Sequence, residues 1–232
     1  MSVVLTSTHS RHKYYAKMLC EKSQIDLIVF ERKNQEDCLT SEEIKYFGDL
    51  RSWNPSCKFI VCEKGEINNS YIEEEIKKVN PAVCFVFGAS ILKENIFNIP
   101  KFGCVNIHTG KTQHYRGVDS AFWAIFEENL DGIGATIHSI NKGIDTGDVI
   151  YQVAPIIEID DDYISLFLKS CHCGFKSVIE NIDSIISGNY LSISKSLDRG
   201  RLFVSKDKTR EKELKVSEKT ARVIGEYLDV KN

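Results

Sequence analysis

The chain has 232 residues, of which 42% are hydrophobic and 27% charged, and its formal net charge is −3. This length suffices to bury one sizeable core, and the composition excludes a low-complexity or disordered chain. The near-neutral charge argues against a strongly basic nucleic-acid-binding protein. Because no run approaches the ~20 apolar residues of a membrane span and no secretory signal opens the chain, we expect a soluble, cytoplasmic protein without a membrane partner.

Eight cysteines are spread along the chain, most of them inside apolar runs such as "FIVCE" and "AVCFVFG". This placement predicts buried, reduced thiols rather than disulfides. Cys171, His172 and Cys173 suggest a zinc site at first sight. Neighbours on a helix face different ways, however, and no second ligand pair completes a set of four, so we expect packing roles and no metal.

The first quarter of the chain predicts a strand, a helix and a second strand. The run "SVVLTS" at 2–7 is short and β-branched, and a helix is expected in 10–23. Residues 25–31, "IDLIVFE", are apolar without alternation, which is typical of parallel strands covered on both faces. Residues 32–57 are polar and predict an irregular or partly helical excursion.

The next segments continue the alternation of strands and helices. Strands are predicted at 58–63, at 82–90, where the run ends in a "GAS" turn, and at 102–108, "FGCVNIH". Helices are predicted at 70–80 and in 91–100, and each is stopped by a proline. This order predicts an α/β fold with a Rossmann-like, open, mostly parallel sheet and helices on both faces.

The second half predicts helix, strand pair and helix. A helix at 118–129 should pack Phe122 and Trp123 into the core, and "GIGATIHSI" and "GDVIYQVAPIIEI" should form a strand pair joined by "NKGIDT". One long helix is expected at 163–188.

The chain is expected to divide into a catalytic domain at 1–190 and a short C-terminal extension at 191–232. The extension should hold a hairpin-like strand in "GRLFVSKD", a solvated charged connection in "KDKTREKELK" and a final helix. This segment could provide a dimer contact.

Two polar side chains stand at the carboxyl end of a predicted central strand, where ligands bind in open α/β sheets. Asn106 and His108 are two residues apart, so an extended backbone projects both to one side. Asp145, in the loop "SINKGIDTGD", could join them. An amide that binds a developing oxyanion, a protonated imidazole and a carboxylate can together handle attack on a carbonyl. Asp145 could instead cap a turn.

The segments "NIH", "YRG" and "GIGATIHSINKGIDTGDVIYQ" together resemble the signature of the 10-formyltetrahydrofolate-dependent formyltransferases, strongly over 83–152. That family includes glycinamide ribonucleotide, methionyl-tRNA and amino-sugar N-formyltransferases. The resemblance implies that Asn106, His108 and Asp145 are the catalytic trio, that 10-formyltetrahydrofolate is the co-substrate and that no metal is needed. It also implies an apolar pocket for the pterin ring, bounded by Phe87, Gly88, Ala89, Ser90, Ile91, Leu92, His138, Ile140, Asn141 and Gly143.

The amino-sugar enzymes are the nearest match for "GIDTGDVIYQ", which implies a nucleotide-linked, dTDP-type dideoxy amino sugar as acceptor, as in the synthesis of surface polysaccharides such as O-antigen. The loop "TSTHSRH" lacks the glycine-rich turn of the glycinamide ribonucleotide enzymes, and 200–232 are too short for the tRNA-binding barrel of the methionyl-tRNA enzymes. We therefore expect small-molecule substrates, no nucleic acid and, because relatives often dimerise, a homodimer. Candidate acceptor-binding residues, with an exposed polar loop as the alternative for several, are His9, Arg11, His12, Lys111, Tyr115 and Arg116.

One loop departs from the family pattern. "HTGKTQHYRG" stands where the family usually has "HPSLLPxYRG", so the double leucine and the proline are missing. Three alternatives to the amino-sugar hypothesis stay open at this point: a formyltransferase for another amine, a hydrolase that releases formate from the same co-substrate, and a non-catalytic folate- or nucleotide-binding protein.

Overall fold

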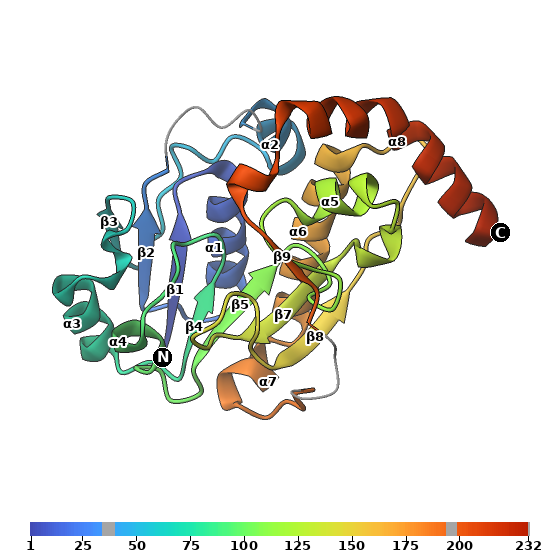
Figure 1. The fold of residues 1–232 in the computed structure, drawn as a ribbon. Coiled ribbons are helices and arrows are strands. Elements are labelled where there is room, and N and C mark those ends of the chain that lie inside the picture. The colour runs from blue at the N-terminus through green and yellow to red at the C-terminus, as the bar shows by residue number, and fades with distance from the viewer. Residues whose placement is uncertain (34–39, 194–198, 232) are drawn as a thin grey trace.

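The computed structural model of the chain describes residues 1–33, 40–193 and 199–231, and a seven-stranded sheet forms its centre (Figure 1). The strand order is β3-β2-β1-β4-β5-β7-β8, in which the first five strands run parallel, β7 is antiparallel to β5, and β8 is antiparallel to β7. The strands are β1 (Ser2–Ser7), β2 (Leu27–Glu31), β3 (Lys58–Cys62), β4 (Val83–Val86), β5 (Cys104–His108), β7 (Ala135–Ser139) and β8 (Val149–Val153). The predicted open, mostly parallel sheet is confirmed.

Helices cover both faces of this sheet, as the alternation of elements predicts. One face carries α1 (Ser10–Lys22), α2 (Thr40–Phe47), α6 (Tyr163–Glu180) and α7 (Ile182–Ser187), and the other carries α3 (Ser70–Val79) and α4 (Glu94–Phe97). Alternate residues of each strand face opposite ways, so in β1 Val4 packs toward α1 and α6 whereas Val3 and Leu5 pack toward α3. Both faces are therefore apolar, which explains the continuous apolar runs.

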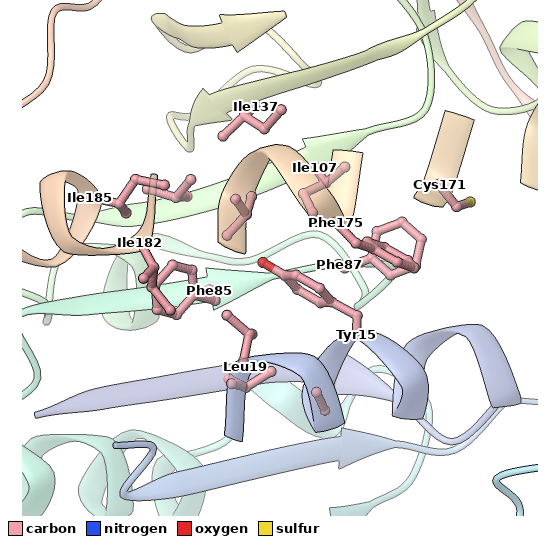
Figure 2. Packing of buried hydrophobic residues seen from close by; sticks show 14 of the residues in the cluster. Tyr15, Leu19, Phe85, Phe87, Ile107, Ile137, Cys171, Phe175, Ile182 and Ile185 are labelled. Carbon is pink, nitrogen blue, oxygen red and sulfur yellow. The ribbon is translucent and has the colours of Figure 1, made fainter. Parts of the chain in front are cut away.

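The larger core is built around a group of aromatic rings (Figure 2). Phe175 of α6 stacks on Tyr15 of α1 with ring centroids 4.9 Å apart, and its edge meets Phe87 at the same distance. All three side chains are buried. This cluster fixes α1 and α6 against the end of β4, which leads into the predicted cofactor loop.

The prediction of one helix over 163–188 is wrong, because the helix breaks at Asn181. Its backbone, at φ −111° and ψ 16°, leaves the helical region, and its side-chain amide donates to the Ser177 carbonyl oxygen at 2.8 Å. A short polar side chain that competes for a backbone carbonyl in this way is typical of a helix end. The chain restarts as α7, and Gly188 ends that helix in the left-handed conformation.

The C-terminal segment packs on the remainder through a second, two-stranded sheet. β6 (Tyr115–Gly117) pairs in parallel with β9 (Arg201–Phe203), whereas we expected β6 as loop and β9 as part of a hairpin; a parallel pair excludes a hairpin connection. α8 (Arg210–Lys231) packs on α5 (Ser120–Phe126), where Phe122 and Trp123 are buried as predicted. Short 3-10 turns complete the element order at Glu66–Asn68, Leu130–Gly132 and Ser205–Asp207.

The charged run at 206–215 is only partly the solvated connection that we expected. From Arg210 onward it forms the first turns of α8, where Glu211 and Lys215 pair at a spacing of four residues. Seven cysteines are free thiols in the part of the chain that the structure describes; Cys38 lies outside the described residues. Within the same ranges no group of His, Cys, Asp or Glu side chains is placed to hold a metal, and no helix is long and apolar enough to cross a membrane.

Candidate active site

β5 and β7 bring the predicted polar residues together at one point of the sheet. Asn106 of β5 lies directly opposite His138 of the antiparallel strand β7, and its amide nitrogen meets the His138 Nε2 at 3.1 Å. The other ring nitrogen of His138 lies 2.8 Å from the carbonyl oxygen of Ser139. A carbonyl can only accept, so Nδ1 carries the proton and Nε2 can accept from Asn106.

Asp145 joins the two strands from the loop between β7 and β8. Its carboxylate lies between two imidazoles, with Oδ2 at 3.3 Å from the His108 Nδ1 and Oδ1 at 3.4 Å from the His138 Nε2. Oδ2 also accepts the backbone N–H of Gly117 at 2.8 Å. Asn106, His108 and Asp145 therefore form one cluster, and His138, which we expected as a cofactor contact, belongs to it.

The backbone of Asp145 adopts the left-handed conformation, with φ 49°. For a residue other than glycine this conformation costs on the order of 1–3 kcal/mol, although aspartate tolerates it better than most residues. The surrounding contacts hold it there. Such backbone outliers are concentrated at active sites, where a side chain must be aimed in a direction that ordinary backbone does not allow.

In the resting protein a neutral His108 ring faces the anionic carboxylate of Asp145. Burial lowers the pKa of His108, and the raising effects of Asp145 and of the Tyr115 carbonyl oxygen offset this only in part. Burial would raise the pKa of Asp145, but the electrostatic attraction of His108 and His138 and the hydrogen bond from the Gly117 N–H outweigh it and hold that pKa below its ordinary value. Asp145 is thus ionised at neutral pH, while the charged form of His108 is disfavoured in the resting protein.

Both nitrogens of the His108 ring nevertheless face oxygen atoms. Nε2 lies 3.0 Å from the Tyr115 carbonyl oxygen and 3.2 Å from the Ser120 hydroxyl, and Nδ1 faces Asp145. Two acceptors on opposite sides are the contacts that an imidazolium requires. The ring is therefore placed to take up a proton when a negative charge forms nearby.

A pocket opens beside this cluster and encloses about 520 Å³, including the solvent at its mouth. Its lining joins the loop after β4 to the loop after β7, as the sequence predicts. Predicted cofactor-binding residues that line it are Ala89, Ser90, Ile91, Leu92, His138, Ile140, Asn141 and Gly143; Val86, Asn106, Ile144 and Asp145 complete the wall. The other two predicted residues lie elsewhere: Phe87 is in the aromatic core, and Gly88 packs against the His12 ring.

The predicted acceptor-binding residues lie in two groups. Near the start of α1, His9 is the residue before the helix, Arg11 forms a buried ion pair with Glu43 of α2, and the buried ring of His12 packs on Phe87. In the second group, the backbone of Lys111 closes a turn with His114 and Tyr115. The Tyr115 side chain is buried, and the Arg116 guanidinium binds two backbone carbonyl oxygens.

Polar contacts hold the loop that lacks the leucines and the proline. The buried Thr136 hydroxyl donates to the Gly110 carbonyl at 2.7 Å and accepts from the Thr112 N–H at 3.3 Å. Next to it, the side-chain amides of Gln113 and Gln152 form two reciprocal hydrogen bonds of 2.9 and 2.8 Å. Hydrogen bonds to β7 and β8 thus hold this loop in place.

The burial of His12 predicts a stability that falls in mild acid. Burial first, and then the charges of Arg11, Lys33 and His9, hold the pKa of His12 well below 6.5. As the pH falls below about 6.5, the unfolded chain binds a proton at His12 that the folded protein does not bind, and the free energy of unfolding should decrease by up to about 1.4 kcal/mol per pH unit. Urea unfolding of the wild type and of His12→Gln between about pH 7 and pH 5 tests this. The variant should show a shallower decrease, and equal slopes would contradict the assignment.

Comparison with known proteins shows which protein family the chain resembles. A family model described as "Formyl transferase" matches residues 2–179. Among curated proteins, the methionyl-tRNA formyltransferase of Caldicellulosiruptor saccharolyticus is 36% identical over 118 residues, which cover 50% of this chain and 38% of that protein. The chain thus matches less than half the length of this relative.

Solved structures show the same fold at low sequence identity. A sugar N-formyltransferase from Shewanella sp. has a TM-score of 0.65 at 15% identity, covering 89% of this chain and 78% of that one. The formyltransferase PseJ from Anoxybacillus kamchatkensis, in complex with UDP-4,6-dideoxy-4-formamido-L-AltNAc and tetrahydrofolate, has a TM-score of 0.61 at 19% identity, covering 93% and 90%. The sheet and its helices thus define a Rossmann-like formyltransferase fold. The chain belongs to the formyl transferase family.

Proposed function

We propose that this protein transfers the formyl group of 10-formyltetrahydrofolate to a primary amine beside Asn106, His108 and Asp145. The observation that carries the proposal is the position of Asp145, which lines the pocket and faces the His108 imidazole at 3.3 Å. The Asn106 carboxamide and the Asp145 carboxylate line the pocket, and the His108 imidazole, which does not line it, contacts that carboxylate; these are the groups that attack on a carbonyl carbon requires. The mechanism uses no metal.

The lining of the pocket suits the pterin ring system of a tetrahydrofolate. Val86, Leu92 and Ile140 supply apolar surface, while Asn141 and the backbone of the two loops supply polar groups at the rim. Pockets for small ligands commonly combine a mainly apolar lining with a few polar groups that fix orientation. The bound co-substrate would supply the formyl carbon to the wall that Asn106 and Asp145 form.

Each member of the trio has a separate task. The Asn106 amide donates a hydrogen bond to the formyl oxygen as negative charge develops there. His108 is neutral at rest because it is buried, and that developing charge, together with Asp145, favours uptake of a proton from solvent as the amine attacks; the ring releases this proton when the tetrahedral intermediate collapses. Asp145 is anionic at rest and accepts the proton that the attacking nitrogen releases, directly or through water; this proton then passes to N10 of the tetrahydrofolate as the bond between N10 and the formyl carbon breaks.

A nucleotide-linked, dTDP-type dideoxy amino sugar is the acceptor that we propose, with a role in surface polysaccharide synthesis. The motif "GIDTGDVIYQ" supports it, as do the sugar N-formyltransferase and the complex of PseJ with a nucleotide-linked formamido sugar. The excess of 33 acidic over 30 basic residues also disfavours a polyanionic partner. A cytoplasmic location and a homodimer belong to the same proposal.

A second acceptor, methionyl-tRNA, is favoured by one specific observation. The curated relative with 36% identity is a methionyl-tRNA formyltransferase. That identity is confined to about half of this chain and covers little more than a third of the relative. The sequence match therefore supports the shared chemistry more strongly than it supports the shared acceptor.

A panel of amines offered together with 10-formyltetrahydrofolate tests the proposal. The panel contains nucleotide-linked 3-amino and 4-amino sugars, glycinamide ribonucleotide and methionyl-tRNA, and mass spectrometry detects the addition of one formyl group. We expect formylation of an amino sugar and release of tetrahydrofolate that depends on it. If only methionyl-tRNA or only glycinamide ribonucleotide were formylated, the proposed amino-sugar acceptor would be wrong. Release of tetrahydrofolate without any amine would identify a hydrolase, and folate binding without turnover would identify a binding protein.

A further inference from the structure

The tripeptide Tyr115-Arg116-Gly117 contacts the catalytic cluster at each of its three positions. The Tyr115 carbonyl oxygen meets the His108 Nε2, Arg116 binds the carbonyl oxygen just before Asp145, and the Gly117 N–H donates to the Asp145 carboxylate. We propose that the β6–β9 pair positions Asp145 against His108, with Arg116 as the positioning residue that joins the Asp145 loop to Gly200, the residue before β9. The catalytic importance of this contact rests on the function proposed above.

Arg116 connects two segments that are distant in the sequence. Its Nε donates to the Gly200 carbonyl at 2.8 Å, and one terminal nitrogen donates to the Ile144 carbonyl at 3.2 Å. The guanidinium is planar and presents its donors in a fixed fork, so the two carbonyl oxygens are held at a set separation. Because the peptide that begins with the Ile144 carbonyl leads into Asp145, this contact restrains the left-handed backbone described above.

Gly117 places the backbone of β6 between Asp145 and β9. Its φ of +87° lies in the region that favours glycine, and a Cβ added there would approach the Phe203 carbonyl oxygen to 2.0 Å. On its other side, the Gly117 N–H reaches the Asp145 Oδ2 at 2.8 Å. Any displacement of β9 is therefore transmitted through Gly117 to the carboxylate.

β9 is itself fixed at several points. The Phe203 ring stacks on Trp123 with centroids 4.1 Å apart, inside the third apolar cluster. The Gly200 N–H donates to the Thr112 carbonyl at 2.9 Å, and the Arg201 N–H donates to the His114 carbonyl at 3.1 Å. The strand is thus a firm support for β6 and for the loop that follows His108.

Titration of His108 by NMR tests this positioning without any turnover. Asp145 raises the pKa of His108, whereas the other charged or titratable groups that face it, His138 and Arg116, lower it. Arg116→Lys keeps the positive charge but removes the fork, so Asp145 should move away and the pKa of His108 should fall toward its value in Asp145→Asn. The matched control is Arg201→Lys in β9, whose side chain is 71% exposed, and it should leave the titration unchanged.

The double variant that combines Arg116→Lys with Asp145→Asn tests whether Arg116 affects the pKa of His108 through Asp145. If Arg116 acts through Asp145, Arg116→Lys should produce no further shift of the His108 pKa in the Asp145→Asn background. A full further shift there, or a wild-type titration in Arg116→Lys alone, would overturn the proposal. Gly200→Ala provides a second route, because its Cβ would approach the His114 backbone to 2.2 Å and displace β9, and it should shift the pKa of His108 in the same direction.

Kinetic measurements on the same variants test whether the position of Asp145 affects the rate of the reaction. Arg116→Lys should lower kcat roughly ten- to hundredfold, with little change in the KM for 10-formyltetrahydrofolate, because a small misplacement of a catalytic group is costly. An unchanged kcat alongside a shifted titration would show that the position of Asp145 does not limit the reaction, and would overturn the catalytic part of the inference. If the wild type formylates no amine, the proposed function fails, and the His108 titration still decides whether Arg116 positions Asp145.

Discussion

Replacement of Asp145 by asparagine should lower kcat by two orders of magnitude or more, which corresponds to about 3 kcal/mol in the barrier. Asparagine has the same shape and tolerates the left-handed backbone, so the loop should keep its conformation. What disappears is the charge that faces the His108 and His138 rings at 3.3 and 3.4 Å. Without it, His108 loses the partner that favours its protonated form, and the attacking amine loses its proton acceptor. His108→Ala should cause a loss of similar size.

Folate binding separates this effect from damage to the pocket. Calorimetric titration with tetrahydrofolate should give similar affinities for the wild type and for Asp145→Asn, because the apolar walls are unchanged. Asp148→Asn is the matched control, since Asp148 belongs to the same loop and the residues that line the pocket do not include it. We expect this variant to retain wild-type kcat. Near-normal turnover in Asp145→Asn would refute the mechanism.

Replacement of Phe175 by alanine should lower the free energy of unfolding by about 3–5 kcal/mol. Phe175 is fully buried at the contact of α6 with α1, and it meets both Tyr15 and Phe87 (Figure 2). Truncation would remove the buried ring and leave a cavity that the rigid sheet behind it cannot fill. Urea unfolding followed by circular dichroism measures the loss.

Phe59→Ala is the matched control for this substitution. Phe59 lies on the edge strand β3 and is 41% exposed, and it meets Phe30 edge to face. Its truncation should cost well under half as much, because less apolar area returns to water and no closed cavity forms. Equal losses in the two variants would show that the α1–α6 contact does not dominate the stability of this core.

Period-two geometry and apolar runs were enough to predict the sheet and the first part of the site. The runs that become β1, β2 and β4 are apolar on both sides, and Asn106 and His108 project together because both lie on one extended strand. The position of Asp145 could be taken only from the motif. No local periodicity marks a residue that depends on a left-handed turn between two antiparallel strands.

The β6–β9 pair could not be found in this way. Tyr115 of β6 pairs with Arg201 of β9, 86 positions further along the chain, and strands of three residues are too short for any periodic signal. The pairing of His138 with Asn106 likewise depends on the antiparallel register of β7, which sequence alone does not set. The first turns of α8 did carry a signal, because Glu211 and Lys215 are four residues apart with the acidic residue first.

The separation of β6 from β9 also has a consequence for the order of assembly during synthesis. The free-energy cost of closing a loop grows slowly with length, by about 0.6 kcal/mol per doubling. The long stretch of chain between β6 and β9 therefore lowers the equilibrium stability of their pairing only slightly. During synthesis, however, the N-terminal part of the chain leaves the ribosome first, at roughly 5–20 residues per second. Among the strands that the structure describes, β9 emerges after all others. The sheet and the pocket loops can therefore be present before the support for Asp145 is, and the nascent chain would gain its reactive geometry as one of its final folding events.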